Sequence, residues 1–204
     1  MKEILSVLPG ITMVLFASWY AYKVYKGAIS PALSTWIIMF TGVFLSILTY
    51  LVSSHFNYLG AALNFGDVLC NVIIISTILL TKKFSLRFRP FEKWYLLASA
   101  IIVVFWSLSH DAFISNLLVQ LILVVSYLPT IQKMITEKKN SESIPVWSVC
   151  LFASVVSLYS AFASGNILSV IYVCRSTFMI MVVMSLGVYF DYFYVRKGRK
   201  NYLR

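Results

Sequence analysis

Long apolar runs, repeated along almost the whole chain, constrain this sequence more than any other feature. A helix needs about 20 mostly apolar residues to cross a bilayer. Seven segments of roughly that length follow one another, at residues 4–22, 33–54, 56–81, 94–108, 112–132, 145–164 and 167–190. Hydrophobic residues make up 60% of the 204 residues and charged residues only 12%. A chain of this composition has more apolar surface than a soluble domain of this size can bury. The sequence therefore predicts an all-α integral membrane protein, and it argues against a soluble enzyme, a disordered chain or a disulfide-linked secreted protein.

The basic residues lie in clusters between the apolar runs, and they predict the direction in which the chain crosses the membrane. Fifteen of the seventeen Lys and Arg residues fall on one set of helix ends, within 23–26, 82–93, 133–139 and 196–204. Cytoplasmic loops are enriched in these residues. With seven crossings, we expect the amino terminus outside and the carboxyl terminus in the cytoplasm, in a cell or bacterial inner membrane. The lipid bilayer then accounts for the net charge of +10, and no nucleic-acid partner is expected.

Two blocks of three helices with the same plan are expected on either side of a linker. Trp36 and Trp147 lie 111 residues apart, and each opens the second helix of its block. One crossing separates the blocks, so they share an orientation and are parallel repeats related by an axis along the membrane normal. The predicted fold is seven transmembrane helices in a 3+1+3 layout. Its parts are a first bundle at 1–81, a basic inner loop and linker helix at 82–111, a second bundle at 112–192 and a basic tail at 193–204.

Part of the second block carries a family resemblance. The segments Ser126-Tyr127-Leu128-Pro129-Thr130-Ile131 and Lys138-Lys139-Asn140-Ser141-Glu142-Ser143-Ile144-Pro145 resemble the PQ-loop/SWEET transporter superfamily. There, a proline and a polar residue end the first helix of each repeat, and a basic, serine-containing loop leads into the second. The resemblance covers about residues 115–190 by motif and the first block by layout, where Ser18-Trp19 stands in place of the proline.

This resemblance implies a transporter that moves a small polar solute, such as a sugar, an amino acid or a vitamin-like molecule, by alternating access. KDEL receptors share the 3+1+3 layout and recognise peptide signals without transporting them. The alternative function is therefore a seven-helix receptor or sensor.

Two charged residues, Asp67 and Arg175, lie inside the predicted spans. A charge at the centre of a membrane helix costs about 2.5–3.5 kcal/mol on insertion scales, so such residues commonly mark transport pathways. Counted from the expected helix starts, Asp67 lies ~17 Å deep and Arg175 ~13 Å deep. Asn64 and Asn71 share the helix face of Asp67, and Tyr172 shares that of Arg175. We expect these five residues to form a substrate site at the midplane.

Two other roles for the charges remain open at this point. Asp67 and Arg175 could form an ion pair that ties the two blocks together without touching a solute. Asp67 could instead take up a proton during each cycle and couple transport to it. The sequence does not distinguish these roles from passive exchange.

Three residues near the inner helix ends are candidates for gating. Pro129 removes a backbone hydrogen bond close to the end of the fifth helix, and it predicts a kink that is either mobile or static. Trp36 and Trp147 could close the cavity from the inside, or anchor their helices at the interface. No pattern typical of a catalytic or metal site occurs at membrane depth, so no enzyme activity, cofactor or metal is expected. Assembly into a homo-oligomer is left open.

Overall fold

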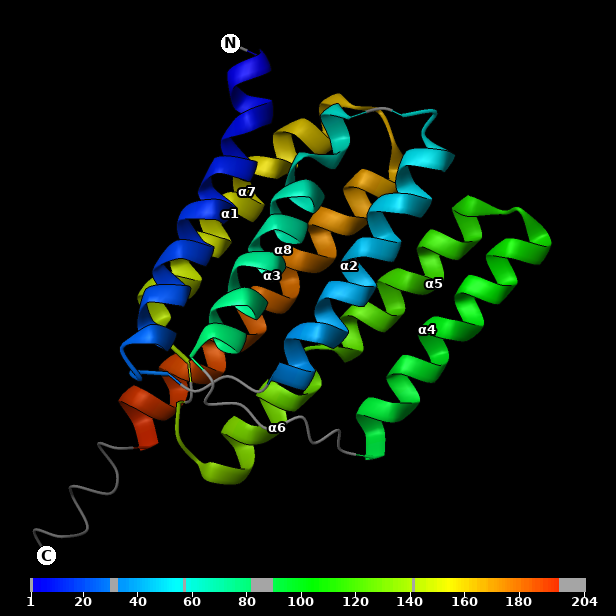
Figure 1. Cartoon of the computed structure of the whole chain (residues 1–204). Coiled ribbons are helices and arrows are strands. Elements are labelled where there is room, and N and C mark those ends of the chain that lie inside the picture. Colours follow the sequence, from blue (N-terminus) through cyan, green and yellow to red (C-terminus); the bar gives the residue numbers. More distant parts are fainter. Residues whose placement is uncertain (1, 30–32, 57, 82–89, 141, 195–204) are drawn as a thin grey trace, which may run out of the picture.

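The chain is helical throughout the part that can be described. The computed structural model describes residues 2–29, 33–56, 58–81, 90–140 and 142–194, and every regular element in these ranges is a helix (Figure 1). The α-helices are α1 (Lys2–Tyr25), α2 (Leu33–Ser53), α3 (Ala62–Leu80), α4 (Pro90–Ser109), α5 (Ala112–Val125), α6 (Leu128–Glu137), α7 (Ile144–Ala163) and α8 (Ile167–Val188). A 3-10 turn, η1 (Leu59–Ala61), precedes α3, and a π-helical turn, η2 (Tyr189–Tyr194), follows α8.

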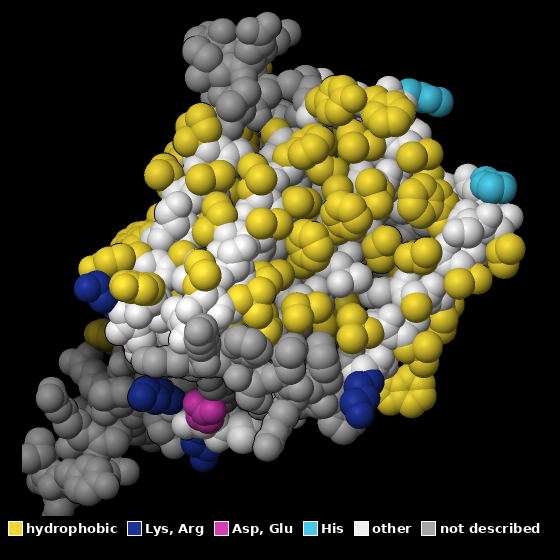
Figure 2. Space-filling model, viewed as in Figure 1, with side chains coloured by type: hydrophobic (Ala, Val, Ile, Leu, Met, Phe, Trp, Pro, Cys, Tyr) yellow, Lys and Arg dark blue, Asp and Glu magenta, His cyan; other side chains and the backbone are white. Residues whose placement is uncertain are grey.

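Most of these helices are long and apolar enough to cross a bilayer. Five spans meet this description in the described residues, at 36–53, 62–80, 112–137, 144–163 and 167–192, and α4 contributes a shorter apolar stretch at 93–109. The chain is therefore a multi-pass membrane protein, as its composition predicts. Figure 2 shows a surface dominated by hydrophobic side chains, with Lys and Arg at one end and histidine at the other. We call these the basic end (Lys23, Lys26, Lys93, Lys138 and Lys139) and the histidine end (His55 and His110).

The contacts between helices define two helix groups. In the first helix group (α1, α2 and α3), α3 packs against both α1 and α2. In the second helix group (α5 to α8), α8 packs against both α7 and α5. The groups meet along two seams, where α1 contacts α7 and α2 contacts α5. Helix α4 packs against α5 and α2, so it lies over the second seam and not over the first (Figure 1).

The third apolar segment becomes helical later than the sequence predicts. His55 and Phe56 have left-handed φ angles of 49° and 63°, which a continuous right-handed helix does not allow. Helix α3 therefore begins at Ala62, after η1, and not at Phe56. Asp67 lies five residues, or ~8 Å, from the start of α3, which is shallower than the predicted ~17 Å.

Two other segments differ from their predicted bounds. Helix α4 runs from Pro90 to Ser109 and is longer than the predicted 94–108, since proline is well accommodated at the first position of a helix. The predicted fifth helix is divided into α5 and α6 by a turn at Ser126 and Tyr127. Pro129 follows this turn in the first two positions of α6, where its missing N–H removes no helical hydrogen bond.

Several predicted features fall outside the described residues. The centre of the basic inner loop, 82–89, and the tail from 195 to 204 belong to this group, as do Ser141 and residues 30–32.

Candidate functional site

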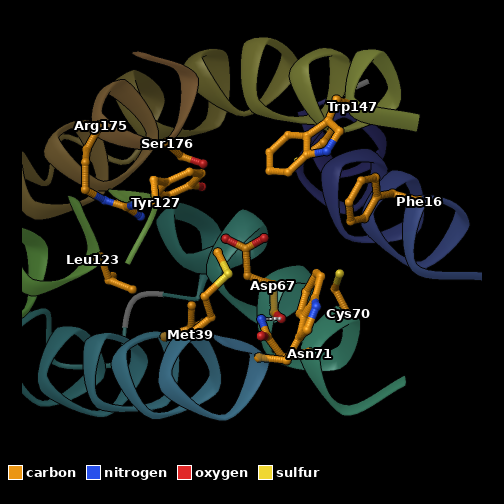
Figure 3. Close-up of a pocket in the computed structure, with 13 residues that line it drawn as sticks. Phe16, Met39, Asp67, Cys70, Asn71, Leu123, Tyr127, Trp147, Arg175 and Ser176 are labelled. Atoms are coloured by element: carbon orange, nitrogen blue, oxygen red, sulfur yellow. Dashed lines mark hydrogen bonds between the residues drawn. The ribbon is translucent and has the colours of Figure 1, made fainter. Parts of the chain in front are cut away.

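A small cavity lies where the two helix groups face each other. Its volume is about 40 Å³, room for a few water molecules at ~10–15 Å³ each. Thirteen residues line it: Asp67, Asn71, Arg175 and Ser176 are polar, Cys70 and Cys150 carry thiols, Phe16, Trp36, Tyr127 and Trp147 are aromatic, and Met39, Val43 and Leu123 are aliphatic. Ten of them are labelled in Figure 3, where Asp67 and Arg175 point into the same space from α3 and α8.

The Asp67 carboxylate is held by one neutral partner. The Tyr172 hydroxyl on α8 donates a hydrogen bond to Asp67 Oδ2 on α3. Among the described residues, no donor reaches the other carboxylate oxygen, Oδ1. Tyr172 does not line the cavity itself. Its role as a substrate contact stays a prediction, and in this structure Tyr172 fixes the carboxylate that faces the cavity.

The Arg175 guanidinium is also held by neutral groups. Its Nε donates to Gln120 Oε1 on α5 at 3.0 Å, and its Cζ lies 4.8 Å from the centre of the Tyr172 ring, within the range of a cation–π interaction. The terminal nitrogens Nη1 and Nη2 make no hydrogen bond within the described part of the chain. Two of the three guanidinium nitrogens thus remain available to an acceptor in the cavity.

The two charges do not pair with each other. Across the described residues no ion pair joins Asp67 to Arg175, and the hydrogen-bond partners of these two charges are the neutral side chains of Tyr172 and Gln120. The ion-pair alternative from the sequence is therefore absent from this conformation. What remains is a carboxylate and a guanidinium that face one small cavity with open hydrogen-bonding positions.

The two predicted asparagines are separated by the structure. Asn71 lines the cavity and is only 3% exposed. Its Nδ2 donates to the Asp67 carbonyl at 2.8 Å, whereas its Oδ1 is buried without a partner among the described groups. Asn64 does not reach the cavity, and its side-chain amide lies 3.1 Å from Ser46 Oγ on α2. Exchanging its amide O and N lets Asn64 accept from Ser46 and donate to the Val43 carbonyl, so we assign it to helix packing.

A buried polar network at the seam between α2 and α5 is absent from the predicted site. Asn116 Nδ2 donates to the Ser46 carbonyl at 2.8 Å and to Thr49 Oγ1 at 2.9 Å. Gln120 Nε2 donates to Ser46 Oγ at 2.9 Å and to Asn116 Oδ1 at 3.1 Å. The Gln120 amide is thereby fixed with its oxygen directed at Arg175. Gln120 thus bonds to Ser46 on α2 and to Asn116 on its own helix.

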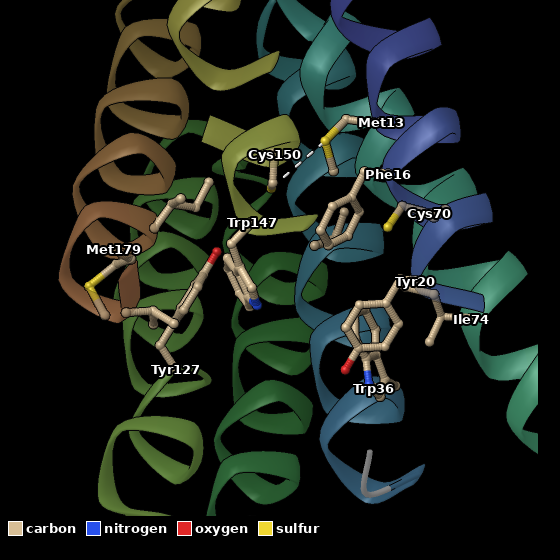
Figure 4. Packing of buried hydrophobic residues seen from close by; sticks show 14 of the residues in the cluster. Met13, Phe16, Tyr20, Trp36, Cys70, Ile74, Tyr127, Trp147, Cys150 and Met179 are labelled. Atoms are coloured by element: carbon tan, nitrogen blue, oxygen red, sulfur yellow. Dashed lines mark hydrogen bonds between the residues drawn. The ribbon is translucent and has the colours of Figure 1, made fainter. Parts of the chain in front are cut away.

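An aromatic layer lies on the side of the cavity toward the basic end. Phe16 and Tyr127 both contact Trp147, with ring centroids 6.2 Å and 6.4 Å away, and Tyr20 lies 5.1 Å from Trp36 and 5.8 Å from Phe16. Figure 4 shows these five rings between the helices. Trp36 and Trp147 are near the first residues of α2 and α7, as predicted, and both line the cavity.

A hydroxyl contact joins the two helix groups toward the histidine end. Tyr50 on α2 accepts a hydrogen bond of 2.8 Å from Ser169 Oγ on α8. Gly60 in η1 packs directly on this pair, and a Cβ atom at Gly60 would lie 2.4 Å from Tyr50 Oη and 2.1 Å from Ser169 Oγ. Contacts between the first and second helix groups therefore lie on both sides of the cavity along the helices.

Two free thiols belong to the cavity and a third does not. Cys70 on α3 and Cys150 on α7 are buried and line it, and Cys174 on α8 is exposed on the helix surface. Within the described residues, no group of three or more His, Cys, Asp or Glu is placed to hold a metal ion.

The chain matches no model of a known protein family, no curated protein and no solved structure. The resemblance to the PQ-loop/SWEET superfamily therefore stays a prediction from the motifs of the second block. The function has to be argued from the site itself.

Proposed function

We propose that this protein is a seven-helix transporter that moves a small polar solute by alternating access around the cavity between its two helix groups. In this proposal α1 and α4 also cross the membrane, and together with the five long apolar spans they give seven crossings. Helix α1 has 24 residues, or ~36 Å at 1.5 Å per residue, and α4 has 20, or ~30 Å. Both lengths suit a hydrocarbon core of about 30 Å.

The helix contacts support a 3+1+3 arrangement. The third helix of each group lies between the other two, and each seam joins the first helix of one group to the second helix of the other. A twofold axis along the membrane normal would generate this pattern, and α4 is left over on one seam as a linker. Parallel repeats of this kind place the substrate site at the repeat interface.

The cavity lining supports the same repeat. Phe16 and Tyr127 lie 111 residues apart, and so do Trp36 and Trp147, and Met39 and Cys150. In the third helices the spacing is 105 residues, which relates Cys70 to Arg175 and Asn71 to Ser176. Ten of the thirteen lining residues thus form five pairs at equivalent positions, as expected for a cavity on the axis between two repeats.

One observation carries the functional proposal. Asp67 and Arg175 face a cavity between the groups with open hydrogen-bonding positions, and contacts between the groups lie on both sides of it along the helices. Charges without full partners are costly at membrane depth, and they commonly mark substrate and ion pathways. A cavity of about 40 Å³ is also far below the ~300–1,000 Å³ of open ligand sites. We interpret this conformation as the occluded state of a transport cycle.

The positive-inside rule supports an orientation. We propose that the basic end faces the cytoplasm, with the amino terminus outside and the carboxyl terminus inside, in a cell or inner membrane. The aromatic layer is then the inner closure, and the contact of Tyr50 with Ser169 is the outer one.

Uptake into proteoliposomes tests the proposed function. Vesicles containing the purified chain and loaded with a mixture of amino acids, sugars and vitamins should accumulate at least one labelled solute by exchange, whereas empty vesicles should not. A receptor of the KDEL type would bind a ligand without moving it. Binding without exchange would therefore contradict the transporter and favour the alternative.

A further inference from the structure

Hydrogen-bond acceptors and donors lie on opposite sides of the cavity. The open acceptors, Asp67 Oδ1 and Asn71 Oδ1, belong to α3 of the first helix group. The open donors, Arg175 Nη1 and Nη2, belong to α8 of the second helix group. A solute that satisfies both sides has to present donors to α3 and acceptors to α8.

Neutral residues hold both charges of the cavity. The Tyr172 hydroxyl holds Asp67, and the Tyr172 ring supports the Arg175 guanidinium at 4.8 Å. Gln120 holds Arg175 Nε from the other side, and its own orientation is fixed by Ser46 and Asn116. The charges are therefore positioned before a ligand arrives, a condition that favours binding because little ordering remains to be done.

The charged residues break the symmetry of the lining. The residue equivalent to Asp67 in the second helix group is the neutral Tyr172, 105 residues later. The residue equivalent to Arg175 in the first helix group is the neutral Cys70. A symmetric framework thus carries one negative and one positive group, which distinguishes the two ends of a bound solute.

We infer that this cavity binds a small zwitterion, with the ammonium group of the solute at Asp67 and Asn71 and its carboxylate at the terminal nitrogens of Arg175. This inference rests on the proposed transport function and names its substrate class. Charge-assisted hydrogen bonds are stronger than neutral ones, and guanidinium binds carboxylate in a two-pronged geometry. The small volume of the closed cavity favours a solute with few heavy atoms.

A binding panel on the purified full chain tests the inference without any variant. The zwitterions are glycine, L-alanine, L-serine and β-alanine. Ethanolamine supplies the ammonium group alone, propionate the carboxylate alone, and glucose a neutral polyol. We expect at least one zwitterion to bind about tenfold or more tightly than each single-charge analogue, since a hydrogen bond to a charged group contributes this much. Binding also raises the melting temperature, because only the folded state binds the ligand.

Two substitutions assign the ends of the ligand. Arg175→Gln should reduce the affinity for the zwitterion to that for ethanolamine and leave ethanolamine binding almost unchanged. Asp67→Asn should reduce it to the affinity for propionate. Asp111→Asn is the matched control, because Asp111 caps the start of α5 outside the cavity, and it should leave the whole panel unchanged.

The outcomes separate this inference from the proposed function. Equal binding of a zwitterion and its single-charge analogues would overturn the inference. Glucose binding that depends on Asp67, together with glucose uptake, would also overturn it but would keep the transporter. No binding and no uptake of any solute in the panel would contradict both.

Discussion

Replacing Asp67 by asparagine is expected to reduce solute uptake by at least about tenfold while the protein still folds. The substitution removes the negative charge and places an amide in the cavity, where an acceptor for the solute is needed. It also weakens the hydrogen bond from Tyr172 to position 67, since an amide oxygen is a poorer acceptor than a carboxylate. The measurement is the initial rate of exchange in proteoliposomes, with the amount of folded protein checked by gel filtration.

Asp111→Asn provides the control for this loss. The Asp111 carboxylate accepts a hydrogen bond from the Ile114 amide at the start of α5. Asparagine is an equally good helix cap, so uptake should remain at the wild-type rate. If Asp67→Asn lowers the melting temperature but retains full uptake, the carboxylate is structural and the proposed site is wrong.

Replacing Gly60 by alanine is expected to open the histidine end of the cavity. The new Cβ would lie 2.1 Å from Ser169 Oγ, 2.4 Å from Tyr50 Oη and 2.8 Å from Ser164 Oγ, all closer than atoms can approach. Tyr50 and Ser169 belong to different helix groups, so relief of the clash has to move these hydroxyl groups and break the contact between the helix groups at this end. We expect a cost of about 1–3 kcal/mol in the closed state. This corresponds to an increase of about 5- to 150-fold in the accessibility of the cavity from that side.

The rate at which a charged thiol reagent modifies Cys70 measures this opening, in a background with Cys150→Ser and Cys174→Ser. Gly10→Ala is the matched control, because its Cβ would meet only the Ala62 carbonyl at 3.8 Å and alanine favours the helix. An unchanged modification rate in Gly60→Ala would show that the contact of Tyr50 with Ser169 does not close the cavity.

Hydrophobic pattern alone predicts much of this fold. The apolar segments give the helical class and the multi-pass membrane character, and both predictions are confirmed. The boundaries fail where the backbone departs from the pattern. Phe56 is apolar but left-handed, and Pro90 extends α4 beyond its apolar stretch. The helix boundaries at these positions depend on the local backbone conformation, which the hydropathy of the sequence does not predict.

The sequence predicts only part of the candidate site, and there is a physical reason why the rest is missed. Charged residues inside apolar runs are conspicuous, so Asp67 and Arg175 stand out in the sequence, and both line the cavity. Ser46 and Asn116 are uncharged and common in membrane helices, and their part in fixing Gln120 depends on the contact between α2 and α5. Asn64 lies on the predicted helix face but bonds to α2. A helix face that is wide enough for three residues contacts two neighbouring parts of the structure, so the three side chains do not all reach the cavity.

Accessibility of the two native cavity thiols from each side of the membrane tests the central claim most directly, and it requires no knowledge of the solute. Cys70 and Cys150 line the cavity from different helix groups, and Cys174 outside it is replaced by serine. A membrane-impermeant thiol reagent is added to right-side-out or to inside-out vesicles. Alternating access predicts that both thiols are modified by the reagent from either side of the membrane. Modification from only one side, or from neither, would contradict a transport cycle around this cavity.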